Sequence, residues 1–249
     1  MATQTGILGL KGTVGGLVFA KDGSVRQKPA SNKAAFNSAA SLARTRENAS
    51  EFGRAAAAGK LLRDSLRVLI AAASDSRMVS RLTQAMRTII GLDEANDRGE
   101  RVVDADNARD ELIGFNFNLG AGIGQTLFFQ YGIAGSGADV TLSIPSLNPQ
   151  TDIVAPQGAT HFEVLYGVSA VNFEAGTFRV ATVAQPLGVL ALNSAALQNR
   201  DVVATLSTAP TADELVVGAV GINFYQMLNG KLYPLNNNST NPLAIEYVG

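Results

Sequence analysis

Hydrophobic and polar residues follow two different periods along the chain, and the period changes near residue 112. Between residues 47 and 91, apolar and small residues recur in steps of three and four, which is typical of helices with one buried face. The polar run Ser74-Asp75-Ser76 divides this region into helices over residues 47–73 and 78–91, so we predict a helical hairpin. Its first helix carries a packing stripe formed by Phe52, Ala55, Gly59, Leu62, Leu66 and Leu69.

From residue 112 onwards the apolar residues fall instead in short segments that glycine, proline and asparagine separate. About eight such segments favour an antiparallel β-sandwich or barrel, and we predict a sandwich that includes a strand at residues 125–131. The pair Asn229-Gly230 between apolar flanks is the strongest hairpin signal, because both residue types readily adopt the left-handed conformation of a tight turn.

The first 30 residues are predicted to form a β-hairpin arm. They contain glycine-rich apolar runs, and Asp22-Gly23 supplies a turn into residues 25–28, after which Pro29 ends the strand. Because an isolated hairpin is only marginally stable in water, either the rest of the chain or another molecule must cover the arm. The apolar residues expected to make that contact are Ile7, Leu8, Leu10, Val14, Leu17, Val18 and Phe19.

Together these elements predict an α+β fold in which an N-terminal β-hairpin arm and a helical hairpin are followed by an antiparallel β-sandwich. We place the arm at residues 1–30, the helical region at 31–92, an acidic linker at 93–111 and the sandwich domain at 112–249. The linker assignment rests on high charge and weak periodicity.

Charge is distributed unevenly along the chain. Residues 1–92 hold 14 Lys or Arg against 5 Asp or Glu, a net charge of +9, whereas residues 93–111 and 112–249 each hold 3 basic and 8 acidic residues, a net charge of −5 for each part. A basic head of this kind attracts either a polyanion or the acidic part of a neighbouring copy. The basic residues expected to form a charged interface are Lys11, Lys21, Arg26, Lys28, Arg44 and Arg46.

Composition and context exclude several kinds of chemistry. The chain has no Cys, so disulfides, thiolate metal sites and cysteine nucleophiles are absent. The only histidine, His161, lies in an alternating strand pattern without the nucleophile turn of a hydrolase. Gly120, Gly122 and Gly124 resemble a phosphate-binding loop, but no Lys follows and the next segment is predicted to be a strand.

Paired carboxylates are the remaining candidates for chemistry. Glu47 with Glu51, or Asp104 with Asp106, could be drawn as an acid–base pair or a cation site. The acidic segment lacks the central glycine and terminal glutamate of a calcium loop, so a solvated charged segment is the simpler interpretation. We therefore predict no catalytic residue, no cofactor and no metal, and a protein that is not an enzyme.

Four stretches of the chain resemble a group of uncharacterised proteins from Bacteroidota. They are GILGLKGTVGGLVFAKDGSVRQKP, RTRENASEFGRAAAAGKLLRDSLR, SDSRMVSRLTQAMR and INFYQMLNGKLYPL. The resemblance covers most of the chain. The resemblance implies a leaderless cytosolic product. Because the group has no assigned activity, the resemblance transfers no functional residue.

The sequence favours a structural protein that assembles into an oligomer or filament, with the arm of one copy docking on the β-domain of the next. One alternative is a nucleic-acid-associated protein that uses the arginine-bearing helices, and another is a carbohydrate-binding module, against which the absence of Trp counts. No stretch is long and apolar enough to span a membrane, and no signal peptide is evident. We expect synthesis in the cytoplasm, with extracellular assembly as an open alternative.

Overall fold

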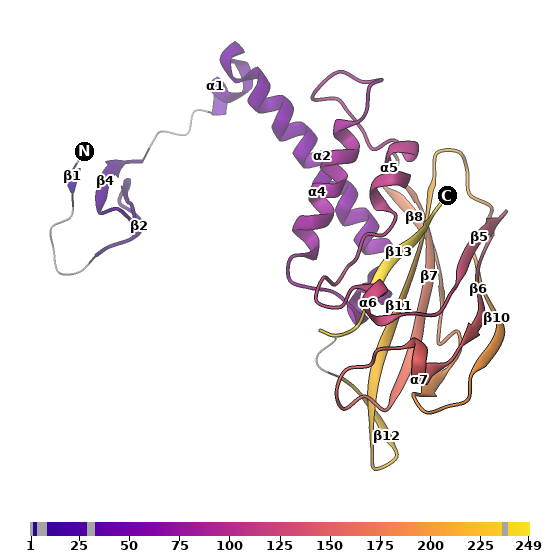
Figure 1. Cartoon of the computed structure of the whole chain (residues 1–249). Coiled ribbons are helices and arrows are strands. Elements are labelled where there is room, and N and C mark those ends of the chain that lie inside the picture. Colours follow the sequence, from indigo (N-terminus) through magenta and orange to yellow (C-terminus); the bar gives the residue numbers. More distant parts are fainter. Residues whose placement is uncertain (1, 4–8, 29–32, 236–238) are drawn as a thin grey trace. The chain divides into compact units, whose positions relative to one another are not determined.

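The computed structural model describes residues 2–3, 9–28, 33–235 and 239–249. It shows an α+β protein, as predicted, with helices and antiparallel sheets. The chain separates into two compact units, Met1–Arg46 and Glu47–Gly249 (Figure 1). The long helix α2 (Ala43–Ser65) begins in the first unit and continues in the second.

The N-terminal unit contains a small antiparallel sheet in the order β1-β4-β3-β2. Its strands are β1 (Ala2–Thr3), β2 (Gly12–Val14), β3 (Leu17–Phe19) and β4 (Ser24–Gln27). Gly15 and Gly16 connect β2 to β3 with φ values of 55° and 85°, a left-handed conformation that glycine adopts without strain. Between β3 and β4, the Asp22 carboxylate accepts hydrogen bonds from the N–H and the hydroxyl of Ser24 at 2.9 and 2.7 Å.

Strand register gives this small sheet one apolar face. Val14 lies opposite Leu17, and Phe19 lies opposite Val25. Because directly paired residues project to the same side of a sheet, as do alternate residues of a strand, these four side chains share a face. Val18, between Leu17 and Phe19, projects from the opposite face.

Short helices complete the N-terminal unit. They are α1 (Lys33–Ser38), the 3-10 helix η1 (Ala40–Leu42) and the first residues of α2. The Arg46 guanidinium donates hydrogen bonds to the backbone carbonyls of Phe36 at 2.8 Å and Ala39 at 2.9 Å, which ties α1 and η1 to the start of α2.

The C-terminal unit begins with a group of helices. The first predicted helix is interrupted at Leu66, so that it forms α2 and the shorter α3 (Arg67–Ala72), whereas the second has the bounds of α4 (Met78–Gly91). A further helix, α5 (Ala105–Leu112), lies in the segment predicted as a linker. Asp104 caps α5 by accepting a hydrogen bond from the Asn107 N–H at 3.2 Å.

The strands of this unit form two antiparallel sheets. The smaller has the order β10-β6-β5, with β5 (Gly132–Ser136), β6 (Asp139–Leu147) and β10 (Leu197–Thr205). The larger has the order β12-β11-β7-β8, with β13 beside β11 and β9 beside β7. Its strands are β7 (His161–Asn172), β8 (Thr177–Val183), β9 (Val189–Ala191), β11 (Leu215–Leu228), β12 (Lys231–Pro234) and β13 (Leu243–Val248).

Hydrophobic cores lie on both faces of the larger sheet. In β11, Val216, Val220 and Ile222 belong to the core shared with the smaller sheet, whereas Val217 and Ala219 belong to the core shared with the helices. The alternation follows from the two-residue period of a strand. Figure 1 shows α2, α4 and α5 on one side of the larger sheet and β5, β6 and β10 on the other.

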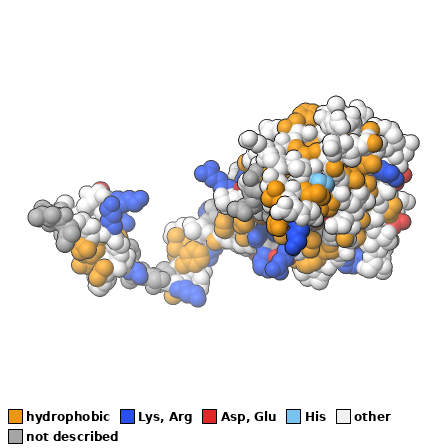
Figure 2. All heavy atoms as spheres, turned by 90° about the horizontal axis from the view of Figure 1, so that it is seen from below, with side chains coloured by type: hydrophobic (Ala, Val, Ile, Leu, Met, Phe, Trp, Pro, Cys, Tyr) orange, Lys and Arg blue, Asp and Glu red, His pale blue; other side chains and the backbone are white. Residues whose placement is uncertain are grey.

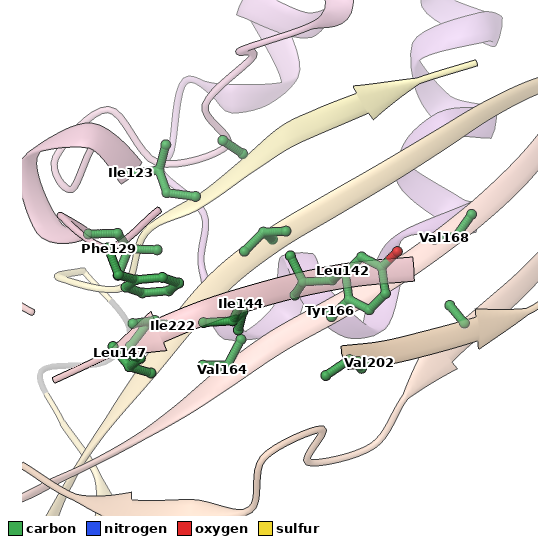
Figure 3. Packing of buried hydrophobic residues seen from close by; sticks show 14 of the residues in the cluster. Ile123, Phe129, Leu142, Ile144, Leu147, Val164, Tyr166, Val168, Val202 and Ile222 are labelled. Atoms are coloured by element: carbon green, nitrogen blue, oxygen red, sulfur yellow. The ribbon is translucent and has the colours of Figure 1, made fainter. Parts of the chain in front are cut away.

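The core between the two sheets is closely packed. Figure 3 shows Leu142 and Ile144 of β6 lying against Val164 and Tyr166 of β7. The Tyr166 side chain is fully buried, and its hydroxyl donates a hydrogen bond to the Val140 carbonyl at 2.9 Å. Because that polar atom is satisfied, the ring is buried without an unpaired donor.

The second core joins the helices to the larger sheet. Leu62 of α2 and Leu82 and Met86 of α4 are fully buried in a cluster that also contains Val217 and Ile245. Helices and strands therefore share a hydrophobic core within one compact unit, and the predicted boundaries at residues 93 and 112 both fall inside that unit.

The segment predicted as a strand over residues 125–131 has a different structure. The short helix α6 (Ile123–Thr126) takes up its beginning, and Leu127 forms only an isolated bridge with Ile153. Another short helix, α7 (Pro149–Asp152), lies directly before Ile153. The apolar residues Leu127 and Phe129 are nevertheless buried in the core between the sheets, which explains why their pattern resembles that of a strand.

Candidate functional site

Within the described part of the N-terminal unit, no other element covers the apolar face of the small sheet. Among residues 3, 9–28, 33–34 and 36–46, none is buried, and Leu10, Val14 and Leu17 are 56%, 65% and 42% exposed. The other four predicted arm residues are half-buried, in the case of Val18 and Phe19, or lie outside the described residues, in the case of Ile7 and Leu8. A small sheet that buries no side chain lacks the hydrophobic contribution that stabilises larger sheets.

The N-terminal unit is rich in basic residues. Residues 1–46 hold seven Lys or Arg and one Asp, a net charge of +6, whereas residues 47–249 hold thirteen basic and twenty acidic residues, a net charge of −7. Figure 2 shows blue basic and orange hydrophobic side chains together on the surface of the N-terminal unit. Of the predicted charged interface, Arg46 is half-buried, and five residues are exposed, namely Lys11, Lys21, Arg26, Lys28 and Arg44.

A cavity of about 660 Å³ lies beside α2 in the C-terminal unit. Its walls come from α2, from residues 93–105, from the turn between β7 and β8, and from the loop before β11. The apolar part of its lining includes Ala57, Ala58 and Leu61 of α2 with Phe173 and Leu215. Volumes of roughly 300–1,000 Å³ are typical of ligand pockets, so this cavity has room for several side chains of a partner.

Asp93 fixes one wall of the cavity. Its side chain is 4% exposed and accepts hydrogen bonds from the N–H groups of Ala95, Asn96 and Val102 at 2.9, 3.2 and 2.9 Å, and from the Asn96 amide at 2.8 Å. The Val102 N–H is the largest cause that holds the pKa of the Asp93 carboxyl below its ordinary value. The Asp93 carboxylate is therefore a structural anchor with its acceptor positions in use.

Glu51 and Arg54 of α2 hold the same segment from the helix side. Glu51 is buried and accepts a hydrogen bond from the Gly99 N–H at 2.9 Å. Arg54 donates to the Gly99 carbonyl at 2.5 Å and the Arg101 carbonyl at 3.2 Å, and pairs with Glu100. The suggested pairing of Glu47 with Glu51 as an acid–base pair has little support, because Glu51 binds the backbone.

The opposite wall carries the loop before β11. Arg179 of β8 donates to Glu214 at 3.1 and 2.5 Å and to the Thr208 carbonyl at 2.8 Å, and Glu214 also accepts from the Thr211 N–H at 2.9 Å. The Arg179 guanidinium is the first cause that lowers the pKa of the Glu214 carboxyl. These contacts fix the loop that contains Asp213.

Acidic side chains line part of the cavity. Asp104, Glu174 and Asp213 contribute to its lining, and all three are exposed. Glu174 and Asp213 form no hydrogen bond or ion pair with any residue that the structure describes. The site thus combines an apolar lining with carboxylates that are free to meet a cationic partner.

A chain of polar residues elsewhere in this unit resembles a proton relay. The Asn241 amide donates at 2.8 Å to both the Ala72 carbonyl and the Asn223 side chain, and Asn223 donates to the Tyr225 hydroxyl at 2.8 Å. That hydroxyl donates to Glu163 at 2.5 Å, and burial, followed by Glu163, raises the pKa of Tyr225. These hydrogen bonds join β7, β11 and α3.

No family model, curated protein or solved structure matches the chain. The predicted resemblance to Bacteroidota proteins therefore stays a prediction. Within the described ranges, no helix is both long and apolar enough to cross a membrane. The same ranges contain no group of three His, Asp or Glu side chains that could hold a metal ion.

The other residues considered from the sequence have ordinary structural places. His161 is half-buried, and its Nδ1 lies 2.9 Å from the Thr160 hydroxyl. The N–H of Gly120 donates to the Asn118 side chain at 3.0 Å, and Gly122 precedes the four-residue helix α6. These glycines therefore lack the strand, loop and long helix that form a phosphate site.

The predicted packing stripe, which runs along α2 and into α3, is buried except at its first position. Phe52 is 54% exposed, whereas its neighbour Glu51 is buried and accepts a hydrogen bond from the Gly99 N–H. The other five residues lie at the interface with α4 or with the larger sheet, and they are Ala55, Gly59, Leu62, Leu66 and Leu69. The sequence does not predict the cavity, because its walls come from four segments that lie far apart in the chain.

Proposed function

We propose that this protein is a non-enzymatic structural protein that self-assembles through its N-terminal unit. The observation that carries the proposal is the apolar face of the small sheet, on which Val14 and Leu17 are exposed while no described residue of the unit is buried. Ordering backbone residues costs about 1–2 kcal/mol each, and a sheet with no core has little to offset that cost. A second molecule that covers the apolar face would supply the missing burial.

A second copy of the chain fits this role. The N-terminal unit carries a net charge of +6 and the C-terminal unit a net charge of −7, so the N-terminal unit of one copy attracts the C-terminal unit of another. A contact between two different surfaces repeats from copy to copy and generates a ring or an open filament. On this proposal the first 30 residues act as the arm, and the C-terminal unit, whose two sheets form a β-sandwich, receives it.

A nucleic-acid partner has less support. Arg54 and Arg81 on the helices are already engaged, since Arg54 binds the Gly99 loop and Arg81 pairs with Asp75 at 2.5 Å and donates to the Asn116 carbonyl at 2.7 Å. Arginines held in this way are not available for phosphate contacts. If a polynucleotide covered the sheet, protein freed of nucleic acid would remain monomeric at every concentration.

The test compares the full chain with a variant that lacks residues 1–30. Multi-angle light scattering should give an assembled mass for the full chain that decreases as salt rises, because salt screens the attraction between the units. The shortened variant should be monomeric, and its circular dichroism should retain the cooperative unfolding of the C-terminal unit. Equal masses for the two proteins would reject the proposal.

A further inference from the structure

We propose that the cavity beside α2 is the acceptor for the N-terminal sheet of a second copy. This inference rests on the proposed function, because it identifies the surface that the arm binds. The occupant is the apolar face that contains Val14, Leu17, Phe19 and Val25, together with exposed basic side chains of the same unit.

Both the proposed donor face and the proposed acceptor are apolar. The donor face consists of short aliphatic and aromatic side chains on a thin sheet, with Val14 and Leu17 both exposed. The acceptor has a volume of about 660 Å³ and an apolar lining that includes Ala57, Leu61 and Phe173. Because Ala57 is exposed and has a small side chain, the backbone of a partner can approach α2 closely at this point.

Charge also matches on the two sides. The donor unit carries exposed Lys21 and Lys28, and the acceptor carries exposed Glu174 and Asp213. Neither acidic side chain has a partner among the residues that the structure describes. An ammonium group of a second copy would pair with carboxylates at the edge of a desolvated apolar contact, where such pairs determine orientation and partner choice.

The walls of the cavity are held in place before any partner arrives. Asp93 anchors the 93–105 segment through four hydrogen bonds, and the Arg179–Glu214 ion pair at 2.5 Å anchors the loop that carries Asp213. A rigid acceptor loses little conformational entropy on binding, so ordering of the arm is the main entropic cost of assembly.

A charge exchange in the full chain tests the assignment. Lys21→Glu/Lys28→Glu alters the donor and Glu174→Lys/Asp213→Lys alters the acceptor, and each pair should weaken self-association about tenfold or more in sedimentation equilibrium. Combining all four substitutions restores the original net charge and should recover most of the association. The control Glu111→Lys/Asp201→Lys changes the net charge by the same amount as the acceptor pair, but at exposed positions outside the cavity. It should have little effect on self-association.

A second variant tests the apolar part of the cavity. Ala57→Trp places a large side chain in the cavity at an exposed helical position, so the fold should tolerate it while assembly is lost. Val79→Trp, at an exposed position of α4 away from the cavity, is the matched control.

The outcomes separate the two proposals. If the acceptor and Ala57→Trp variants assemble like the unaltered chain while removal of residues 1–30 gives a monomer, the cavity is not the acceptor and the arm still drives assembly. If removal of residues 1–30 leaves the mass unchanged, the proposed function itself is wrong.

Discussion

Asp93 shows how a single buried carboxylate can position a functional surface. Its side chain satisfies the N–H groups of Ala95, Asn96 and Val102, and in its absence these donors would be left without their acceptor. An unsatisfied buried donor costs about 1–3 kcal/mol, and these donors are partly buried, so Asp93→Ala should lower the free energy of unfolding by up to that amount in urea titration at neutral pH. Asp97→Ala, at an exposed position of the same segment, should have little effect.

The contribution of Asp93 should also depend on pH in a defined direction. Its pKa in the folded protein lies below the ordinary value of 3.8, so the stabilisation is complete above that value and is lost as the pH falls through the lower, folded value. The difference in stability between the unaltered chain and Asp93→Ala should therefore be smaller at about pH 3 than at neutral pH. An equal difference at both pH values would show that the carboxylate charge is not involved.

At the scale of elements, Gly59 shows how α2 and α4 approach each other. A Cβ at this position would lie 3.7 Å from the Leu82 side chain and 3.8 Å from the Met86 side chain, which are ordinary van der Waals distances. Because glycine in a helix interior is less favourable than alanine by roughly 0.5–1 kcal/mol, Gly59→Ala should stabilise the protein by about that amount in thermal or urea unfolding.

Gly221 in β11 provides the contrast to Gly59. A Cβ there would lie 2.5 Å from the Pro242 carbonyl oxygen and 2.9 Å from the Leu243 side chain, so backbone would have to move. Gly221→Ala should therefore destabilise the C-terminal unit. Destabilisation by Gly59→Ala as well would mean that the helices approach more closely than the structure shows.

The two faces of the N-terminal sheet should respond differently to the same substitution. Leu17→Asp places a charge on the apolar face and should abolish assembly, because the carboxylate would be buried in the contact. Val18→Asp adds the same charge one residue later, on the opposite face, and should leave most of the assembly intact. Light scattering of both variants measures the difference, and equal loss in both would contradict the assignment of the faces.

Elements with strong local signals could be predicted from the sequence. The bounds of α4 follow from the polar residues before Met78 and from the apolar period that continues to Ile90. The turn between β11 and β12 follows from Asn229 and Gly230, which have φ values of 50° and 77°. In both cases neighbouring residues alone determine the conformation.

Features that depend on distant contacts could not be predicted. Phe52 fits the apolar period of α2, yet the segment around Gly99 covers Glu51 instead. The cavity likewise forms where α2 meets segments near Glu174 and Asp213, more than a hundred residues away in the chain. A pattern within one segment carries no information about which other segment will lie against it.

At the scale of the whole molecule, stability and charge are divided between the units. The C-terminal unit has two hydrophobic cores and a net charge of −7, whereas the N-terminal unit has no buried residue among those described and a net charge of +6. A unit without a core is expected to be ordered by its partner, as coupled folding and binding requires. Assembly and folding of the N-terminal unit are then the same event.

Amide hydrogen exchange at several protein concentrations tests this claim most directly. We expect the amides of β3 and β4 to be protected in concentrated solution and to lose protection on dilution, while those of β7 and β11 remain protected throughout. Protection of β3 and β4 that does not change with concentration would contradict the account, because the chain would then cover its own N-terminal sheet.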